Sequence, residues 1–361
     1  MSRPSQAQLD MDALRNNIAI ARALAPRAKL LAVVKANAYG HGALAVAREL
    51  EARADALAVA SLEEAAGLRD GGIGGAIFLL EGVFEPGELA EAAARDLWLA
   101  VHNREQLAWL EEARLARPLH CWLKVNTGMN RLGFAPEDTE ASYRRLRDCA
   151  NTTGEPVLFT HLACAEYLDR DTTDRQLDCF EALCAGAPRS AANSPGLLAW
   201  PRSHLDWVRP GYMLYGNSPL AEPHPSAAGL QPVMTLTSKV IALRDVAPGE
   251  TVGYGGTWVA RQPSRIATVA IGYGDGYPRD AANGTPVLVG GRRAPLAGRV
   301  SMDMITVDVT GRADVGIGTP VELWGRGLPL DDVARGAGAS GYELLTRMPG
   351  RTPRVCIDSA V

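Results

Sequence analysis

The stretch Leu30–Gly42, LLAVVKANAYGHG, is the segment from which the fold of the chain is predicted. Five apolar residues come first, and a continuous apolar run of this length is typical of a parallel strand covered on both faces. Lys35 then stands at the carboxyl end of the predicted strand. A lysine amine that is desolvated loses its proton more easily and can attack a carbonyl, so this position favours a Schiff-base lysine. Gly40 and Gly42 allow a tight turn after it.

Seven more apolar runs follow and alternate with helical patterns. They begin at Ala56, Ala76, Leu97, Leu119, Val157, Arg189 and Met213. The helical patterns carry their own end signals: Ser61 and Glu64 have the spacing of a capping box. Eight strand–helix units predict an α/β protein in which residues 8–227 form a (β/α)8 TIM barrel.

The pattern changes near Pro232, where β-branched and partly alternating segments replace the helical ones. The segment VLVGGRRAPL predicts a hairpin with Gly290 and Gly291 at its turn. Residues 228–361 are therefore predicted to form a smaller, mainly β domain.

Composition excludes several classes of partner. The 361 residues carry a net charge of −4, which gives no electrostatic reason to bind nucleic acid or an anionic membrane. The first residues contain no apolar signal region and no stretch reaches transmembrane length, so a cytoplasmic location is expected. No pair of the six cysteines has C-x-x-C spacing, core packing is expected for Cys179 and Cys184, and no metal site is predicted.

Polar residues stand at the ends of the later barrel strands, where TIM barrels carry their chemistry. They are Lys124, Asn126 and Arg131, then His161, Asn193 and Ser194, and finally Arg209, Gly211 and Tyr212. The loops after strands seven and eight often bind phosphate, to which Ser194 can donate its hydroxyl and Gly211 its main-chain N–H. A Schiff-base lysine and a phosphate cradle on one rim indicate pyridoxal phosphate.

Each of these residues also has a plainer explanation by itself. Lys35 can extend from the rim into solvent, Ser194 can cap a helix, and Arg209 can be a surface arginine beside a proline. Tyr254 can be an ordinary aromatic residue of a β segment, and His41 is expected to have no role.

Eight motifs together resemble the alanine racemase family. They are AVVKANAYGHG, KVNTGMNRLGF, THLACAE, ANSPG, VRPGYMLYG, VGYGGTW, IGYGDGYPR and GRVSMDM, and they occur in the order of that family. The resemblance implies an isomerase that interconverts L-alanine and D-alanine by a two-base mechanism on a pyridoxal phosphate aldimine. It also implies a homodimer with shared active sites, which supplies D-alanine for peptidoglycan or catabolises it.

The resemblance also implies roles for the matched residues. Lys35 would hold the cofactor and act as the base on the D side, and Tyr254 of the partner subunit would be the base on the L side. Arg209 would face the pyridine nitrogen, His161 would link Arg209 to Tyr254, and Arg131 would hold the substrate carboxylate.

The remaining implied roles concern the cofactor phosphate, the substrate side and the entrance. Lys124 matches a position that is often carbamylated. The phosphate would be held by Tyr39, Ser194, Gly211 and Tyr212, with Asn193 beside them. Met302 and Tyr273 would lie on the substrate side, and Glu166, Tyr273 and Arg279 would line the entrance.

The expected chemistry is physically consistent. Racemisation removes a proton from one face of the α-carbon and delivers one to the other, so two bases on opposite faces satisfy the geometry. An arginine such as Arg209 keeps its own proton, so the pyridine nitrogen stays unprotonated and the ring remains a weaker electron sink. This should suppress side reactions such as transamination.

Departures from the family and competing functions are also visible. Asn126 replaces a common aspartate, Gly256 a common arginine, and Gly350 a hydroxyl-bearing residue. A non-catalytic carrier of pyridoxal phosphate would need only the barrel, and a basic amino-acid decarboxylase would have glutamate where Arg209 stands. A cofactor-free Schiff-base aldolase leaves the phosphate loops unexplained.

Overall fold

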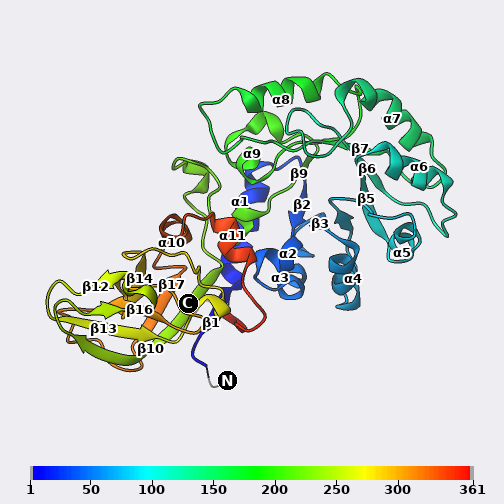
Figure 1. The fold of residues 1–361 in the computed structure, drawn as a ribbon. Helices are drawn as coiled ribbons and strands as arrows, with labels where there is room; N and C mark the ends of the chain where they lie inside the picture. Colours follow the sequence, from blue (N-terminus) through cyan, green and yellow to red (C-terminus); the bar gives the residue numbers. More distant parts are fainter. Residues whose placement is uncertain (1–2, 358–361) are drawn as a thin grey trace. The chain divides into compact units, whose positions relative to one another are not determined.

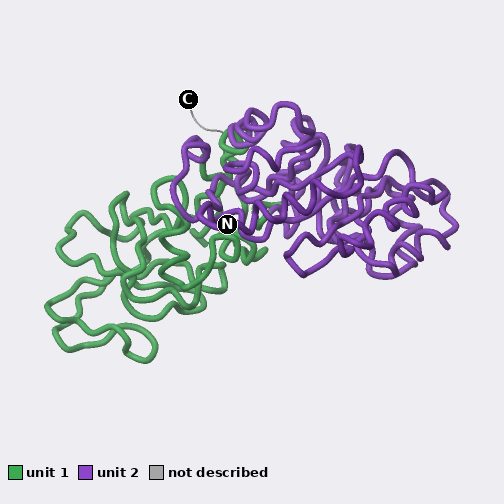
Figure 2. Tube along the Cα trace, turned by 90° about the horizontal axis from the view of Figure 1, so that it is seen from above, with its two compact units in different colours: residues 1–14, 39–42, 231–361 green, residues 15–38, 43–230 purple. Residues whose placement is uncertain are grey.

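The computed structural model describes residues 3–357, and the chain divides into two compact units. One contains residues 15–38 and 43–230, and the other combines 1–14, 39–42 and 231–361 (Figure 2). We call them the barrel unit and the β unit. The predicted ranges, 8–227 and 228–361, differ from these units mainly at residues 8–14, because the first strand pairs with strands from late in the sequence, and at residues 39–42, which also belong to the β unit. The last four residues of the range 228–361 lie outside the described residues.

The barrel unit is a closed barrel of eight parallel strands, as predicted (Figure 1). Strand β2 pairs with both β3 and β9, and this last pairing closes the barrel. The strands are β2 (Lys29–Val33), β3 (Ala56–Val59), β4 (Ile77–Leu79), β5 (Leu97–Val101), β6 (Cys121–Lys124), β7 (Val157–Phe159), β8 (Arg189–Ser190) and β9 (Trp207–Val208).

Helices follow the barrel strands along the chain. The α-helices are α1 (Met11–Leu24), α3 (Ala43–Leu50), α4 (Leu62–Asp70), α5 (Glu88–Ala94), α6 (Arg104–Glu112), α7 (Pro136–Asp148), α8 (Thr172–Glu181) and α9 (Ser194–Ala199). The short element α2 (Lys35–Tyr39) is a left-handed turn and not a right-handed helix. Short 3-10 helices are η1 (Pro201–Ser203), η2 (Tyr212–Tyr215) and η3 (Pro225–Ala227). Capping side chains begin several of the α-helices: Ser61 Oγ accepts from Glu64 N in α4, and Asn103 Oδ1 accepts from Gln106 N in α6.

Aromatic side chains fill the barrel interior. The ring of Phe78 on β4 lies 4.6 Å from that of Trp122 on β6 and 5.7 Å from that of Phe159 on β7, measured between centroids. Because β4 and β7 are not neighbours in the sheet, the contact between Phe78 and Phe159 crosses the interior. The barrel is thus a packed core, and polar chemistry is left to its rim.

One predicted barrel strand is wrong. The run beginning at Met213 is the 3-10 helix η2, and the eighth strand is Trp207–Val208. This run is apolar because its side chains are buried, although its backbone is not extended. Tyr215, for example, is fully buried, and its hydroxyl donates to the carbonyl of Val33. Arg209 therefore follows its strand directly, as the other rim residues do.

The β unit is built on an eight-stranded sheet in which β15, β14, β17, β10, β1 and β18 are neighbours in that order. Strand β13 pairs with β10 and β16. The strands are β1 (Gln6–Asp10), β10 (Met234–Val246), β13 (Ser264–Val269), β14 (Pro286–Val289), β15 (Arg292–Pro295), β16 (Ile305–Asp308), β17 (Pro320–Trp324) and β18 (Arg354–Ile357). A separate ribbon pairs β11 (Thr251–Val252) with β12 (Trp258–Val259).

Short helices interrupt the β unit, and its predicted hairpin is confirmed. The helices are η4 (Tyr254–Gly256), η5 (Tyr273–Asp275), α10 (Leu330–Gly336) and α11 (Gly341–Thr346). Gly290 and Gly291 connect β14 to β15 with φ angles of 56° and 75°, the positive values that a type I′ turn requires. Within residues 3–357, none of the helices combines the length and apolar character needed to cross a membrane.

Candidate active site

Lys35 begins α2, just past the carboxyl end of β2, and is half-buried. The carboxyl ends of parallel strands meet at one rim of a barrel, so Lys35 shares this rim with the residues that follow β6 to β9. The register pairs Leu30 with Val208, which makes β9 the neighbour of β2. Lys35 and Arg209 therefore leave adjacent strands at the same rim.

Arg209 is only 4% exposed and is held by the barrel itself. Nη1 donates to the Ser190 hydroxyl, and Nη2 donates to the carbonyl oxygens of Thr160 and Ala191. Burial lowers the pKa of Arg209 to about 9, which leaves the guanidinium charged at neutral pH. None of these three bonds uses Nε, whose N–H is therefore suited to a ligand.

Lys124 ends β6 within a cluster of positive charges. Its Nζ lies 5.3 Å from the ring centroid of Phe159, and Cζ of Arg209 lies 5.5 Å from the same ring. Burial, and then the charges of Arg209, Arg131 and Lys35, lower the pKa of Lys124 to about 8. A substantial fraction of this amine is therefore neutral just above physiological pH.

His161 lies in the loop after β7. Burial, followed by the charges of Arg209 and neighbouring cations, holds its pKa well below the ordinary value, so the imidazole is neutral. Its main chain is fixed by Gln176 of α8, a side chain that is 1% exposed. The Gln176 amide donates to the His161 carbonyl (3.0 Å) and to Thr127 Oγ1 (3.2 Å), and accepts from Ala163 N (2.9 Å).

The ends of β8 and β9 bring a hydroxyl and main-chain N–H groups together. Ser194 Oγ lies 2.9 Å from Gly211 N and 3.3 Å from Met213 N and accepts from both. Asn193, not Ser194, is the N-cap of α9, because its Oδ1 accepts from Gly196 N at 3.1 Å. Ser194 is thus directed to the loop after β9, as a phosphate ligand would be.

The loop after β6 carries Arg131, which is exposed. Asn126 shapes this loop: its Oδ1 accepts from Gly128 N at 3.1 Å and from Asn130 N at 2.9 Å. Asn126 therefore provides an acceptor for two main-chain N–H groups, as an aspartate would, but it has no negative charge. Glu166, in the loop after β7, is half-buried.

Two tyrosines predicted at the phosphate lie in different units. Tyr212 begins η2 of the barrel unit and is 2% exposed. Tyr39 belongs to the β unit, where its ring centroid lies 6.2 Å from that of Tyr342. Burial raises the pKa of Tyr39 to about 12, so its hydroxyl stays protonated and can donate. His41, expected to have no role, is buried with Nδ1 2.8 Å from the carbonyl of Tyr39.

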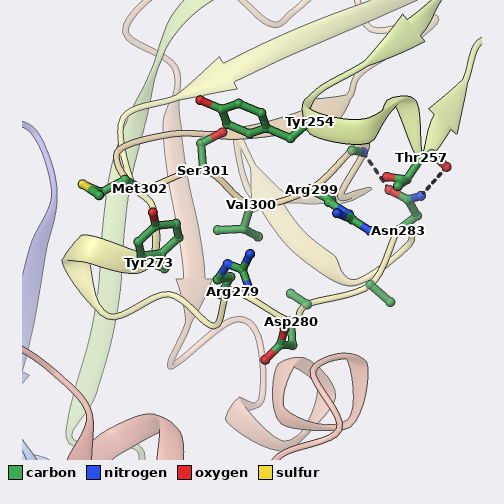
Figure 3. Close-up of a pocket in the computed structure, with 13 residues that line it drawn as sticks. Tyr254, Thr257, Tyr273, Arg279, Asp280, Asn283, Arg299, Val300, Ser301 and Met302 are labelled. Atoms are coloured by element: carbon green, nitrogen blue, oxygen red, sulfur yellow. Dashed lines mark hydrogen bonds between the residues drawn. The ribbon is translucent and has the colours of Figure 1, made fainter.

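The β unit has a pocket of about 820 Å³ that is lined by Tyr254, Tyr273, Arg279 and Met302, among other residues (Figure 3). Tyr254, on η4, is 73% exposed, and Met302 is 52% exposed. Figure 3 also shows Arg299 on this pocket, a residue that sequence reasoning did not single out although it belongs to the motif GRVSMDM.

Main-chain hydrogen bonds join the two loops of this pocket. Tyr273 N donates to the carbonyl of Ser301 at 3.0 Å, and Gly274 N donates to that of Met302 at 2.9 Å. Only glycine fits at position 272, because a Cβ there would lie 2.2 Å from the Ser301 oxygen. The positions of Tyr273 and Met302 are therefore fixed relative to each other.

Asp275 holds the loop of Tyr273 in place and was also not identified from sequence. It is fully buried and accepts from Arg3 at 2.6 and 3.0 Å, while its Oδ2 accepts from Gly272 N at 2.9 Å. Arg351 lies 3.0 Å from its Oδ1. A carboxylate paired with two guanidinium groups thus fixes the start of η5.

The predicted residues form two groups, one in each unit. The barrel unit holds Lys35, Lys124, Arg131, His161, Glu166, Asn193, Ser194, Arg209, Gly211 and Tyr212. The β unit holds Tyr39, Tyr254, Tyr273, Arg279 and Met302. The first group combines an amine, a hydroxyl with main-chain N–H groups, and a fixed guanidinium, which suits a ligand with a carbonyl, a phosphate and a hydrogen-bond acceptor.

Comparison with protein families matches both parts of the chain. Residues 9–219 match the family model described as alanine racemase, N-terminal domain. Residues 233–356 match the model described as alanine racemase, C-terminal domain. Together the two models cover more than half of the chain.

Individual relatives agree over nearly the whole length. The chain is 52% identical to alanine racemase of Chromohalobacter salexigens over 98% of each chain. It is 53% identical to the biosynthetic alanine racemase of Salmonella typhimurium over 96% of this chain and 97% of the relative. The crystal structure of biosynthetic alanine racemase from Pseudomonas aeruginosa matches with a TM-score of 0.94 and 49% identity, covering 98% of this chain and 99% of the other.

Proposed function

The chain belongs to the alanine racemase family, and on this premise we propose that it interconverts L-alanine and D-alanine with pyridoxal phosphate bound at the barrel rim. The observation that carries the proposal is the rim itself, where Lys35, Ser194 and Arg209 follow β2, β8 and β9. Relatives at about half identity are named biosynthetic, which supports a role in supplying D-alanine for peptidoglycan.

The rim fits pyridoxal phosphate in each of its functional groups. Lys35 would bind the aldehyde carbon, and the Nε of Arg209 would face the ring nitrogen. The phosphate would be held by the Ser194 hydroxyl and the loop of Gly211 and Tyr212, with Tyr39 as a further donor and Asn193 fixing the start of α9. The Gly211 N–H, which donates to Ser194 Oγ, would change partner to reach the phosphate. When bound, the cofactor withdraws electrons from the Cα of the amino acid and so makes its α-hydrogen acidic.

Arg209 keeps its proton when it faces the ring nitrogen. Its pKa of about 9 lies above neutral pH, and the barrel holds its terminal nitrogens in place. A group that stays charged and does not pass on its proton limits electron withdrawal. Arg209 thereby favours exchange of a single proton over side reactions such as transamination.

Two groups would move the α-proton on opposite faces. Lys35 Nζ would serve the D side, and Tyr254 Oη of a second copy would serve the L side. Tyr254, Met302 and Met304 are 73%, 52% and 43% exposed on the β unit, a large apolar exposure that a second copy would cover. We therefore propose a homodimer with shared active sites.

His161 would connect Arg209 to Tyr254. Its imidazole is neutral because its pKa is held far below the ordinary value. A neutral imidazole has one acceptor nitrogen and one donor N–H, so it can accept from the guanidinium and donate toward the phenol oxygen. This connection would hold the Tyr254 hydroxyl of the second copy in place.

On the substrate side, Arg131 would hold the carboxylate, and Tyr273 and Met302 would line the space for the side chain. Glu166 and Arg279 would lie at the entrance. Main-chain hydrogen bonds tie Tyr273 to the Ser301–Met302 loop, so both side chains would stand beside the substrate and favour a methyl group. Serine can still enter, because a small pocket rejects an added hydroxyl only weakly.

Lys124 is proposed to carry a carbamate. Its neutral amine, available because its pKa is about 8, would form an N–C bond to carbon dioxide and release one proton. The resulting anion would lie among the positive charges of Arg209, Arg131 and Lys35. It would orient Arg131, whose loop is shaped by the uncharged Asn126.

We also propose that the protein works in the reducing cytoplasm. Its six cysteines are free thiols, and Cys356 is exposed. An exposed free thiol is compatible with a compartment that keeps cysteine reduced.

The test begins with the purified holoenzyme. An absorbance band of the covalently bound cofactor, with borohydride labelling on Lys35, is expected, together with conversion of L-alanine to D-alanine. Lys35→Ala should lose both the band and the conversion, whereas Lys239→Ala, which alters an exposed lysine, should lose neither. Carbon dioxide release from lysine or ornithine would instead support a decarboxylase. Label on a different lysine would refute the proposal.

A further inference from the structure

The carboxylate of Glu64 joins the ends of two barrel strands. Glu64 lies in the first turn of α4, and its Oε1 accepts from Ala36 N at 2.6 Å while its Oε2 accepts from Ala60 N at 2.9 Å. Ala36 directly follows Lys35, and Ala60 directly follows β3. Ser61 and Glu64 therefore do not form the usual capping box, in which the glutamate accepts from the N–H of the N-cap residue. Here the glutamate accepts from the N–H groups of Ala36 and Ala60 instead.

The backbone that receives this contact is in an unusual conformation. Ala36, Asn37 and Ala38 have φ/ψ of 52°/51°, 55°/45° and 53°/52°, and Tyr39 has φ of 50°. These residues form a left-handed turn, which is costly for residues with a Cβ and persists only where surrounding contacts determine it. Lys35 stands at the entry to this turn, so the direction of its side chain depends on how the turn is held.

Further hydrogen bonds hold the turn within the barrel unit, one between main-chain groups and one from a side chain. Ala38 N donates to the carbonyl of Val34 at 2.8 Å, and Asn37 Oδ1 accepts from Ala43 N at 2.8 Å. The Glu64 contact is at the first left-handed residue, where the chain leaves β2. It is therefore the side-chain contact nearest to Lys35 along this backbone.

We propose that Glu64 is a positioning residue for Lys35: it fixes the Ala36 peptide against the end of β3 and so directs the lysine amine at the rim. This rests on the proposed function, in which Lys35 carries the cofactor. Ala36 is exposed, so water can replace the lost hydrogen bond, and removing Glu64 should alter geometry more than overall stability. A misplacement of about 1 Å is enough to cost about 100-fold in rate.

The test compares Glu64→Ala and Glu64→Gln with Glu63→Gln. Glu63 lies in the same first turn and is exposed, so its variant matches the loss of charge near the helix N-terminus. Full-length protein is studied with and without pyridoxal phosphate. The measurements are hydrogen exchange of a peptide spanning residues 34–40, the absorbance of the bound cofactor against pH, kcat and KM for alanine, and the melting temperature.

For Glu64→Ala we expect the amides of 36–38 to exchange about tenfold faster, with exchange in β6 and α7 unchanged. The kcat should fall about 10-fold to 100-fold with little change in KM, and the absorbance profile should shift with pH. The melting temperature should stay within about 2 °C. Glu64→Gln keeps one acceptor oxygen and should be intermediate, and Glu63→Gln should match the wild type.

Wild-type exchange at 36–38 in both Glu64 variants would overturn the proposal. A general rise in exchange with a lower melting temperature would also overturn it, because that outcome marks an ordinary structural brace. The exchange comparison on cofactor-free protein does not depend on the reaction. Failure of the proposed function would instead appear as absence of cofactor on Lys35 in the wild type.

Discussion

Replacing Lys124 with methionine should stabilise the protein at neutral pH while lowering its activity. Lys124 is 8% exposed. Burial, together with the charges of Arg209, Arg131 and Lys35, lowers its pKa from 10.5 to about 8. One pKa unit corresponds to about 1.4 kcal/mol, so the charged amine costs the folded state about 3 kcal/mol at pH 7. Methionine has a similar length and no charge, so Lys124→Met should recover most of this free energy of unfolding.

The pH dependence follows from the direction of the shift. At high pH, above the ordinary lysine pKa, Lys124 is neutral in both states and costs nothing. As the pH falls from there to about 8, the unfolded chain binds a proton that the folded protein does not, so stability falls. Below that range both states are charged and the cost is constant. The advantage of Lys124→Met should therefore be about 3 kcal/mol at pH 7 and about 1.5 kcal/mol at pH 9.5.

The assay is urea unfolding, followed by circular dichroism, in buffer free of carbon dioxide at both pH values. Lys239→Met is the control, because Lys239 is exposed on β10 and its removal should change stability by less than about 0.5 kcal/mol. Added bicarbonate should stabilise the wild type but not Lys124→Met if the amine takes up a carbamate. A variant that is less stable than the wild type at pH 7, or an advantage that does not shrink at pH 9.5, would refute the reasoning.

Three further changes test other parts of the site. Tyr254→Phe should retain bound cofactor but lose most exchange of the α-proton of L-alanine in D₂O, measured by NMR, because the L-side base is gone; normal exchange would exclude this role. Asp275→Asn should destabilise the protein by about 3 kcal/mol in urea unfolding, since a buried carboxylate paired with two arginines is lost, whereas the partly exposed Asp303→Asn should cost less than about 1 kcal/mol. Gln176→Leu should lower the free energy of unfolding by about 2 to 4 kcal/mol and reduce kcat, because it leaves the His161 carbonyl and the Ala163 N–H unpaired. An unchanged free energy of unfolding would contradict this role of Gln176.

Much of the barrel could be predicted because parallel strands leave a simple pattern. Continuous apolar runs identified β2 to β7 to within a few residues, and Gly290–Gly291 located the β14–β15 hairpin. The run at Met213 was misassigned because a short buried 3-10 helix has the same apolar composition as a strand. The membership of β1 in the β unit was not predictable, since its pairing with β18 spans nearly the whole sequence.

The candidate site was predictable only in part. Position at a strand end singled out Lys35, Lys124 and Ser194, and the resemblance to a family added Tyr254. The roles of Glu64, Gln176 and Asp275 depend on which distant main-chain groups they contact, and nothing in their local sequence specifies those partners. Charged and amide residues are common in helices, so their residue types alone could not distinguish them from ordinary solvated positions.

The pairing of β1 with β10 and β18 has a consequence for biosynthesis. Ala7 pairs with Arg354, which is made almost 350 residues later. At about 5 to 20 residues per second, a ribosome needs about 20 to 70 seconds to supply that partner. During this time β1 lacks its β18 partner, and the barrel sequence, which ends at residue 230, is complete well before that partner is made. A nascent chain of this protein therefore passes through a stage in which β18 cannot yet cover β1.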